Sequence, residues 1–247
     1  EKGFYFQADK HIYWLDGRKM TGVTTILNST LAKPALIQWA ANMAVESVDK
    51  QIWETQLIPY EYVNGNVRII ITDEKLREIL EVARTAHAAK RDKSADIGTL
   101  AHDWISRWIK GEEPKRDESL AVITDNFLKW AEEAKPKFLA SEKVVYAGDP
   151  KLFYAGTIDF ICEIDNNVYI GDLKTSSGIF SEMFYQTAGY EIALHAMEPD
   201  KWNIHGHIIV NCTKSGKLNT KIHYDFEENK KAFLAALTLY RIIQRAK

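Results

Sequence analysis

The segment that decides the fold runs from Thr157 to Lys174 and reads TIDFICEI-DNN-VYIGDLK. Two runs rich in β-branched and aromatic residues flank the polar triplet that begins at Asp165, which is typical of a tight hairpin turn. Because side chains alternate along a strand, Asp172 and Lys174 are expected on one face, beside Asp159 of the neighbouring strand. The sequence therefore predicts two carboxylates and one ammonium converging within an otherwise apolar sheet.

Charges buried in a sheet cost several kcal/mol unless they are paired or bind a metal. Asp159 and Asp172 would form an oxygen-rich site suited to Mg²⁺ or Mn²⁺, to which the backbone carbonyl of Leu173 can add another oxygen. Lys174 can orient an attacking water and offset the negative charge of a phosphate. This combination indicates metal-assisted hydrolysis of a phosphodiester.

The bulk composition excludes several classes of protein. The 247 residues are 46% hydrophobic, which is enough for one large domain or two small ones, and the net charge is −2. That charge argues against a protein that coats duplex DNA by electrostatics alone, but not against an enzyme with a local basic groove. The sequence contains no run of about 18 apolar residues, so no membrane span is predicted. Cys162 and Cys212 are interpreted as buried reduced thiols, and two cysteines cannot hold an iron–sulfur cluster.

The pattern along the chain predicts helices first and a sheet later. A small hairpin is expected around Asp16-Gly17, with a further strand-like run at 23–27, and a second hairpin around Asn64-Gly65. The charged run 90–93 is expected to interrupt a helix. The expected helices are 34–49, 73–90, 96–109, 117–135, 179–197 and 228–245, and the expected later strands are 142–147, 155–164, 168–174, 204–212 and 219–225.

The order of these elements predicts an α/β fold with a mixed central sheet flanked by helices. The helix at 179–197 joins two strands, which favours a parallel crossover. We expect one nuclease domain over residues 1–247. In that domain a mainly helical N-terminal half with small hairpins, 1–137, covers a catalytic sheet core at 138–247.

Several motifs resemble one nuclease family. Asp159 and Asp172-Leu-Lys174 match the Asp…(Asp/Glu)-x-Lys signature of the PD-(D/E)XK nuclease superfamily. Gly98-Thr-Leu-Ala-His102 is similar to the Gly-x-x-x-His element of its RecB-like branch, and Gln186-Thr-Ala-Gly-Tyr190 to the Gln-x-x-x-Tyr helix of that branch. Val23-Thr-Thr-Ile26 resembles the N-terminal opening of phage exonucleases and the mitochondrial genome maintenance exonuclease.

The four elements follow the order of the family and span about residues 20–212. The resemblance implies a restriction-endonuclease-like fold. Ile158 stands where the superfamily name has a proline, which is common in the RecB-like branch, and the cysteines of the iron–sulfur members are missing. The implied roles are metal ligand for His102, Asp159 and Asp172, catalytic lysine for Lys174, DNA contact or support of the site for Gln186 and Tyr190, and a supporting role for Glu142 and Thr175.

Other residues have a weaker connection to function. His205 and His207 share a strand face, as zinc ligands can, but no third ligand is evident, so they are interpreted as ordinary strand residues. Five basic residues are candidates for phosphate contacts, although solvated loops explain them equally well: Lys90, Arg91, Lys93, Lys214 and Lys217.

The sequence thus predicts an Mg²⁺- or Mn²⁺-dependent exonuclease that acts on DNA ends or single strands in repair, recombination or replication. Two alternatives stay open: a structure-specific or flap endonuclease of the same fold, and a non-catalytic nucleic-acid-binding module. DNA is the expected partner, together with a recombinase, helicase or single-strand-binding protein. The resemblance implies the cytoplasm of a bacterial or phage-infected cell, or alternatively the mitochondrial matrix.

Overall fold

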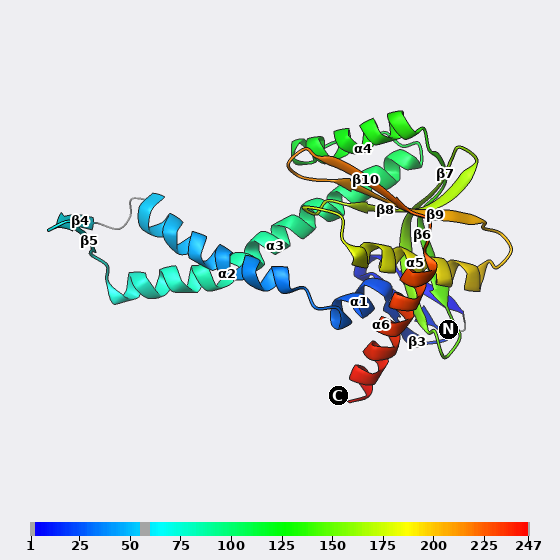
Figure 1. The fold of residues 1–247 in the computed structure, drawn as a ribbon, viewed down its shortest axis with the longest axis horizontal. Coiled ribbons are helices and arrows are strands. Elements are labelled where there is room, and N and C mark those ends of the chain that lie inside the picture. Colours follow the sequence, from blue (N-terminus) through cyan, green and yellow to red (C-terminus); the bar gives the residue numbers. More distant parts are fainter. Residues whose placement is uncertain (1–2, 55–59, 247) are drawn as a thin grey trace. The chain divides into compact units, whose positions relative to one another are not determined.

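The computed structural model describes residues 3–54 and 60–246, and it is an α/β structure (Figure 1). The chain divides into two compact units. The larger unit contains the described residues up to Leu31 and those from Gly98 onward, and the smaller unit contains Ala32–Ile97. The expectation of one nuclease domain stays a prediction. The division does not fall at the boundary expected between residues 137 and 138, because N-terminal strands join the same sheet as the C-terminal ones.

An eight-stranded mixed sheet forms the centre of the larger unit. Its strands follow the order β1-β2-β3-β7-β8-β9-β10, with β6 also paired to β7. The bounds of the strands are β1 Phe4–Gln7, β2 Ile12–Leu15, β3 Arg18–Gly22, β6 Lys137–Ala147, β7 Tyr154–Ile164, β8 Asn167–Lys174, β9 Ile204–Cys212 and β10 Leu218–His223. The helices of this unit are α1 Val23–Thr30, the last part of α3 (Asp73–Ile109), α4 Ala121–Ala134, α5 Ser181–Met197 and α6 Glu227–Arg245, with short 3-10 turns at Ala8–Lys10 and Glu118–Leu120.

The predicted hairpin between β7 and β8 is confirmed. The two strands pair antiparallel from Ile164 opposite Asn167 to Phe160 opposite Gly171. Asp165 and Asn166 of the turn have φ values of 50° and 61°, a left-handed conformation that Asp and Asn tolerate better than most residues. The predicted crossover is also confirmed, because β8 and β9 run parallel and α5 connects them.

Helices cover both faces of this sheet. On one face Phe127 of α4 packs edge-on against Phe160 of β7, with the ring centroids 6.3 Å apart. On the other face Gln186 of α5 reaches Asp172 of β8. Figure 1 shows α4 and α5 on opposite sides of β8. The face under α5 is therefore the one that carries the acidic residues.

The strand-like run expected at 23–27 is wrong, because these residues begin α1. Val23, Ile26 and Leu27 are buried there in the main core cluster. Their spacing of three and four residues follows the helical period and not the alternation of a strand. Packing of this face outweighs the strand preference of Val, Thr and Ile.

The smaller unit contains α2 (Pro34–Asp49), a π-helical turn (Lys50–Glu54), a hairpin of β4 (Tyr60–Val63) and β5 (Asn66–Ile69), and the first part of α3 (Asp73–Ile109). The hairpin around Asn64-Gly65 is confirmed. The expected interruption at 90–93 is wrong, since α3 continues through it. The run contains neither Gly nor Pro, and Lys and Arg are good helix formers. Among the described residues, no helix is both long enough and apolar enough to span a membrane.

Candidate metal centre

The β7–β8 hairpin supplies the centre of the candidate site. The pairing of Phe160 with Gly171 brings Asp159 and Asp172 to adjacent positions at the end of the ladder. Gly171 is required here, because a Cβ atom would lie 1.9 Å from a ring carbon of Phe160. Asp172 is completely buried, and its Oδ2 atom lies 2.5 Å from the Nζ atom of Lys174. The expected convergence of acid and ammonium is thus present.

Asp159 is held by two contacts from different elements. Its Oδ2 atom accepts a hydrogen bond of 2.7 Å from the backbone N–H of Leu173, and its Oδ1 atom lies 3.5 Å from Nδ1 of His102 on α3. Burial raises the pKa of Asp159, but the attraction of His102 and Lys174 outweighs it and the pKa ends below its ordinary value. Asp159 is therefore a carboxylate at neutral pH. Leu173 thus contacts Asp159 through its backbone N–H, whereas the sequence analysis expected its carbonyl to bind the metal ion.

A close approach of α3 to the end of β8 positions His102. A Cβ atom at Gly98 would lie 3.3 Å from Oγ1 of Thr175, which leaves almost no room for a larger side chain. Gly98 and His102 are four residues apart and therefore share one face of the helix. Because residue 98 is a glycine, α3 can approach Thr175 closely. His102, one helical turn later, then reaches Asp159. This gives a physical reason for the Gly-x-x-x-His spacing and a supporting position for Thr175.

Glu142 of β6 completes a group of three possible ligands. One ligand atom from each of His102, Glu142 and Asp159 lies within 4.8 Å of the others. Glu142 has a φ of 50°, in the left-handed region, and this backbone conformation is strained for a residue other than glycine. Burial and then repulsion from Asp159 raise its pKa to about 7. The sequence assigned Glu142 only a supporting role, because nothing local signals the positive φ that turns it toward Asp159.

Asp172 lies one strand away from that group, with both carboxylate oxygens engaged. Oδ2 faces Lys174, and Oδ1 accepts a 3.1 Å hydrogen bond from Nε2 of Gln186. Burial, opposed by Lys174 and reinforced by Asp159, raises the pKa of Asp172 to about 6. Burial lowers the pKa of Lys174, but the two aspartates raise it above its ordinary value, so the ammonium stays charged.

Helix α5 supplies the predicted Gln186–Tyr190 pair. Nε2 of Gln186 also donates a 2.7 Å hydrogen bond to the hydroxyl of Tyr190, which is buried. Burial and the nearby aspartates raise the pKa of Tyr190 well above its ordinary value, so the hydroxyl keeps its proton. A Cβ atom at Gly156 would lie 2.5 Å from the Tyr190 ring. Gly156 was missed by the sequence analysis, although a glycine inside a strand can signal such a close approach.

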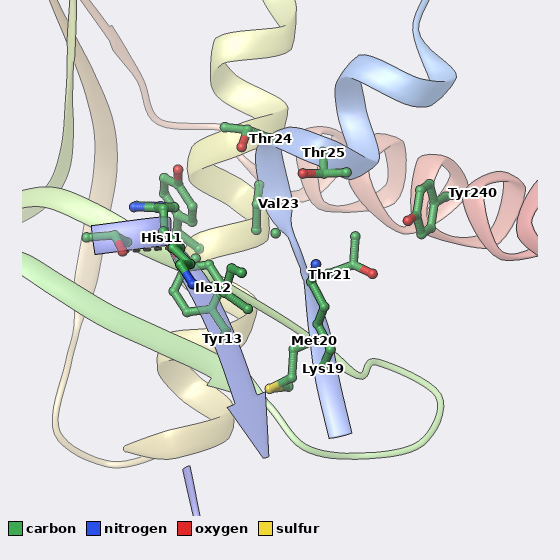
Figure 2. Close-up of a pocket in the computed structure, with 15 residues that line it drawn as sticks. His11, Ile12, Tyr13, Lys19, Met20, Thr21, Val23, Thr24, Thr25 and Tyr240 are labelled. Atoms are coloured by element: carbon green, nitrogen blue, oxygen red, sulfur yellow. Dashed lines mark hydrogen bonds between the residues drawn. The ribbon is translucent and has the colours of Figure 1, made fainter. Parts of the chain in front are cut away.

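A pocket of about 600 Å³ opens beside Tyr190 (Figure 2). It is lined from β2, β3, the start of α1, the beginning of β7, and one tyrosine each of α5 and α6. The hydroxyl of Tyr13 links two of its walls, at 2.7 Å from His11 Nε2 and 2.9 Å from Thr157 Oγ1. Its polar lining includes Lys10, His11, Lys19, Thr21, Thr24 and Thr25. The sequence analysis did not predict this pocket, because its walls come from five separate segments: 10–13, 19–25, 156–157, Tyr190 and Tyr240.

The expected phosphate-contacting residues are divided between the two units. Lys90, Arg91 and Lys93 are exposed on α3 within the smaller unit, and Arg91 pairs with Asp92 at 3.0 Å. Lys214 and Lys217 are exposed in the turn between β9 and β10 of the larger unit. Their role in binding DNA stays a prediction.

The interpretation of the remaining candidates is confirmed. His207 is completely buried and binds side chains of α5, whereas His205 is exposed, so the two do not form a zinc pair. Cys162 and Cys212 are both free and buried, as expected. Burial raises the pKa of each thiol to about 12, which makes them unreactive.

The residues present fit a hard divalent cation. Carboxylate oxygens are the ligands that Mg²⁺ and Mn²⁺ prefer, and an imidazole nitrogen is a ligand that transition metals tolerate. His102, Glu142 and Asp159 would hold the ion, with Asp172 at the neighbouring position. No protein-family model matches this chain, and no curated protein matches it significantly.

Proposed function

We propose that this protein is an Mg²⁺- or Mn²⁺-dependent deoxyribonuclease with a restriction-endonuclease-like fold of the RecB-like type. The observation that carries the proposal is one cluster of donors beside one buried lysine. His102, Glu142 and Asp159 offer ligand atoms within 4.8 Å of each other, and Lys174 lies beside Asp172 on the adjacent strand. A structural ion pair would need one acid for its lysine, whereas three acids crowd this site.

The protein side chains have separate roles in the proposed hydrolysis. A bound cation supplies Lewis-acid stabilisation of negative charge on a phosphate and acidifies water. Lys174 holds a positive charge where a phosphate oxygen or an attacking water would lie. Gln186 orients Asp172 through the 3.1 Å hydrogen bond, and Tyr190 fixes Gln186 in turn. Helix α5 therefore keeps the acid in place.

The pocket beside Tyr190 supports action at an end of DNA. Its volume of about 600 Å³ is within the range of small-molecule sites and is sufficient for a nucleotide. Lys10 and Lys19 would attract a phosphate. A strand whose terminal nucleotide enters this pocket would be cut near its end, which favours an exonuclease over a flap endonuclease.

Cleavage of labelled DNA by a lysine variant and its matched control tests the proposal. Lys174→Ala should abolish cleavage of linear single- and double-stranded oligonucleotides in Mg²⁺ or Mn²⁺. Lys143→Ala is the control, because Lys143 is equally buried, with 19% of its side chain exposed, and is paired with Glu198 at 3.1 Å outside the site. Equal cleavage by both variants would reject the assignment.

Two further substrates and one binding measurement separate the alternatives. A covalently closed circular single strand should stay intact if a free end is required, whereas an endonuclease would cut it. Absence of Mn²⁺ binding in titration calorimetry, together with retained DNA binding, would instead identify a non-catalytic module. Digestion of 5′- and 3′-labelled oligonucleotides then gives the polarity.

A further inference from the structure

The side chain of Asn211 on β9 is a buried amide that lacks hydrogen-bond partners in the part of the chain that the structure describes. Its side chain is completely buried, and neither Nδ2 nor Oδ1 has a hydrogen-bond partner among the described residues. Thr187 and Glu191, which are also buried in this unit, both bind His207. Whereas both polar atoms of Asn211 lack a hydrogen bond, three other side chains of the described ranges lack one at a single buried atom: Asn126, Ser141 and Asp172. Buried polar groups in folded proteins are almost always paired, so an unpaired carboxamide calls for an explanation.

The register of the sheet places Asn211 next to Lys174. Strands β8 and β9 run parallel, with Asp172 opposite Ile209 and Lys174 opposite Asn211. Ile209 packs against Met183 and Phe184 of α5. Because side chains alternate along a strand, Asn211 lies on the same face, about 5 Å across the sheet from Lys174. An unused acceptor therefore neighbours the lysine of the proposed active site.

The present contacts of Lys174 explain why a second acceptor is needed. Its ammonium lies 2.5 Å from Oδ2 of Asp172, whose other oxygen accepts from Gln186. Each carboxylate oxygen has a second lone pair for a cation, but a divalent cation bound to Asp172 would repel the ammonium and weaken its contact with Oδ2. An ammonium has three donors, and one that leaves Asp172 must find another acceptor in a largely buried place. The carboxamide oxygen of Asn211 is the free acceptor that the register brings nearest.

We propose that Asn211 is a positioning residue for Lys174, accepting a hydrogen bond from the ammonium when Asp172 engages a divalent cation. The inference rests on the proposed nuclease function and makes it more specific. In the metal-free state Lys174 binds Asp172 and Asn211 is unpaired. In the loaded state the lysine turns toward Asn211, which holds its positive charge beside the phosphate.

The variant Asn211→Leu tests the inference, because leucine has a similar volume and no acceptor. Removing an unpaired buried amide should leave the melting temperature equal or higher. The loss of the acceptor should lower kcat by roughly ten- to a hundredfold with little change in KM, the range expected for one hydrogen bond to a charged group. It should also weaken Mg²⁺ binding in calorimetry, because Lys174 then leaves Asp172 less readily.

Two further variants make the result interpretable. Asn219→Leu is the matched control, since Asn219 is the exposed asparagine that pairs with Asn211 across β9 and β10, and it should change neither measurement. Asn211→Asp keeps the shape and the acceptor, so its kcat should stay closer to that of the unaltered protein. A kcat and an Mg²⁺ affinity of Asn211→Leu equal to those of the unaltered protein would overturn the inference.

The outcomes also separate this inference from the proposed function. If the unaltered protein cleaves no DNA but Asn211→Leu still weakens Mg²⁺ binding, the nuclease assignment fails and the role of Asn211 toward Lys174 stands. If the unaltered protein cleaves DNA and Asn211→Leu matches it in both measurements, the nuclease assignment stands and the role of Asn211 fails. A loss of kcat accompanied by an equal loss of folded protein in both Asn211 variants would also count against it.

Discussion

Helix α5 borders two buried charge clusters that differ in how completely they are neutralised. Around Glu191, Oε1 lies 3.0 Å from Lys230 and Oε2 lies 3.0 Å from His207, whose other nitrogen is 3.0 Å from Thr187. Every one of these groups has a partner within the fold. Around Asp172, by contrast, three acids share one lysine and one histidine. The first cluster is neutralised within the fold, whereas in the second the acids outnumber the basic groups that neutralise them.

The pKa directions of the acids express the same difference. Burial alone would raise the pKa of Glu191, but His207 and Lys230 lower it below its ordinary value. The pKa of Asp172 is raised to about 6, and that of Glu142 to about 7. Folding therefore favours the carboxylate of Glu191 and disfavours those of Asp172 and Glu142, while Asp159 alone of the second cluster keeps a lowered pKa. Strongly perturbed acids of the second kind concentrate at functional sites.

The largest expected effect comes from removing a charge in the crowded cluster. Asp159→Asn should lower cleavage of DNA by at least about a thousandfold, since it removes a proposed ligand oxygen and its charge. The melting temperature should fall only slightly, because asparagine loses the attraction of His102 and Lys174 but keeps an acceptor for the N–H of Leu173. Steady-state cleavage and thermal unfolding of the same preparation check this. If Asp159→Asn still cleaves DNA, or if it is inactive because it no longer folds, the two clusters do not differ in the way that we infer.

A large effect on stability, without a specific effect on activity, is expected in the neutralised cluster. Glu191→Ala should lower the free energy of unfolding by about 3 kcal/mol, because it leaves Lys230 and His207 without their shared partner. Urea unfolding measures this change. Glu228→Ala is the control, since Glu228 belongs to an exposed pair with Lys231 and should change stability little. Similar losses for the two variants would mean that burial does not distinguish the pairs.

Metal should reverse the effect of Glu142 on stability. In EDTA, Glu142→Gln should raise the melting temperature by about 2–4 °C, the shift that corresponds to about 1 kcal/mol at this size. With Mn²⁺ the unaltered protein should gain more stability than the variant, because the ion binds the folded state. Glu163→Gln is the control, since Glu163 pairs with Lys137 away from the site. An equal Mn²⁺ response in all three proteins would exclude Glu142 as a ligand.

The smallest expected effect is a change in pH dependence. Burial lowers the pKa of His207 below its ordinary 6.5, an effect that Glu191 opposes and that Lys230 and His223 reinforce. The unfolded chain therefore binds the proton more readily. The contribution of His207 to stability is complete above about pH 6.5 and is lost as the pH falls through that value toward the lower pKa of the folded state.

Unfolding by urea at pH 7.5 and pH 5.5 measures this contribution. Glu142 and Asp172 stabilise the fold as the pH falls, because their pKa values are raised to about 7 and about 6. The contribution of His207 is therefore the difference between two proteins: from pH 7.5 to pH 5.5, His207→Gln should lose less stability, or gain more, than the unaltered protein. His205→Gln is the matched control, because His205 is exposed two residues earlier on the same strand. If His205→Gln and His207→Gln show the same dependence, burial of His207 is not its cause.

The local pattern of residues determined much of the fold. The turn at Asp165 and the alternation on either side of it were sufficient to pair Asp159 with the strand that carries Asp172 and Lys174. The spacing of Gln186 and Tyr190 likewise predicted a shared helix face, and the two side chains are hydrogen bonded. Such features depend on periods of two and 3.6 residues, which are readable over a few positions.

Local patterns failed where packing overrode them. The run that begins at Val23 favours a strand by composition, yet it forms α1 because Ile26 and Leu27 enter the core on one helix face. The charged run at 90–93 resembles a loop by composition, yet it continues α3. Propensities of this kind differ by less than 1 kcal/mol per residue, which packing easily exceeds.

By itself the sequence predicted which residues would carry the chemistry: the two aspartates, the lysine, His102 and the Gln186–Tyr190 helix. Only the tertiary structure decided that Glu142 joins His102 and Asp159, and that Asn211 lies unpaired beside Lys174. The physical reason is the range of the interactions. The face on which a side chain lies follows from its neighbours along the chain. The residue that lies beside it on another strand depends on how distant segments pair and pack.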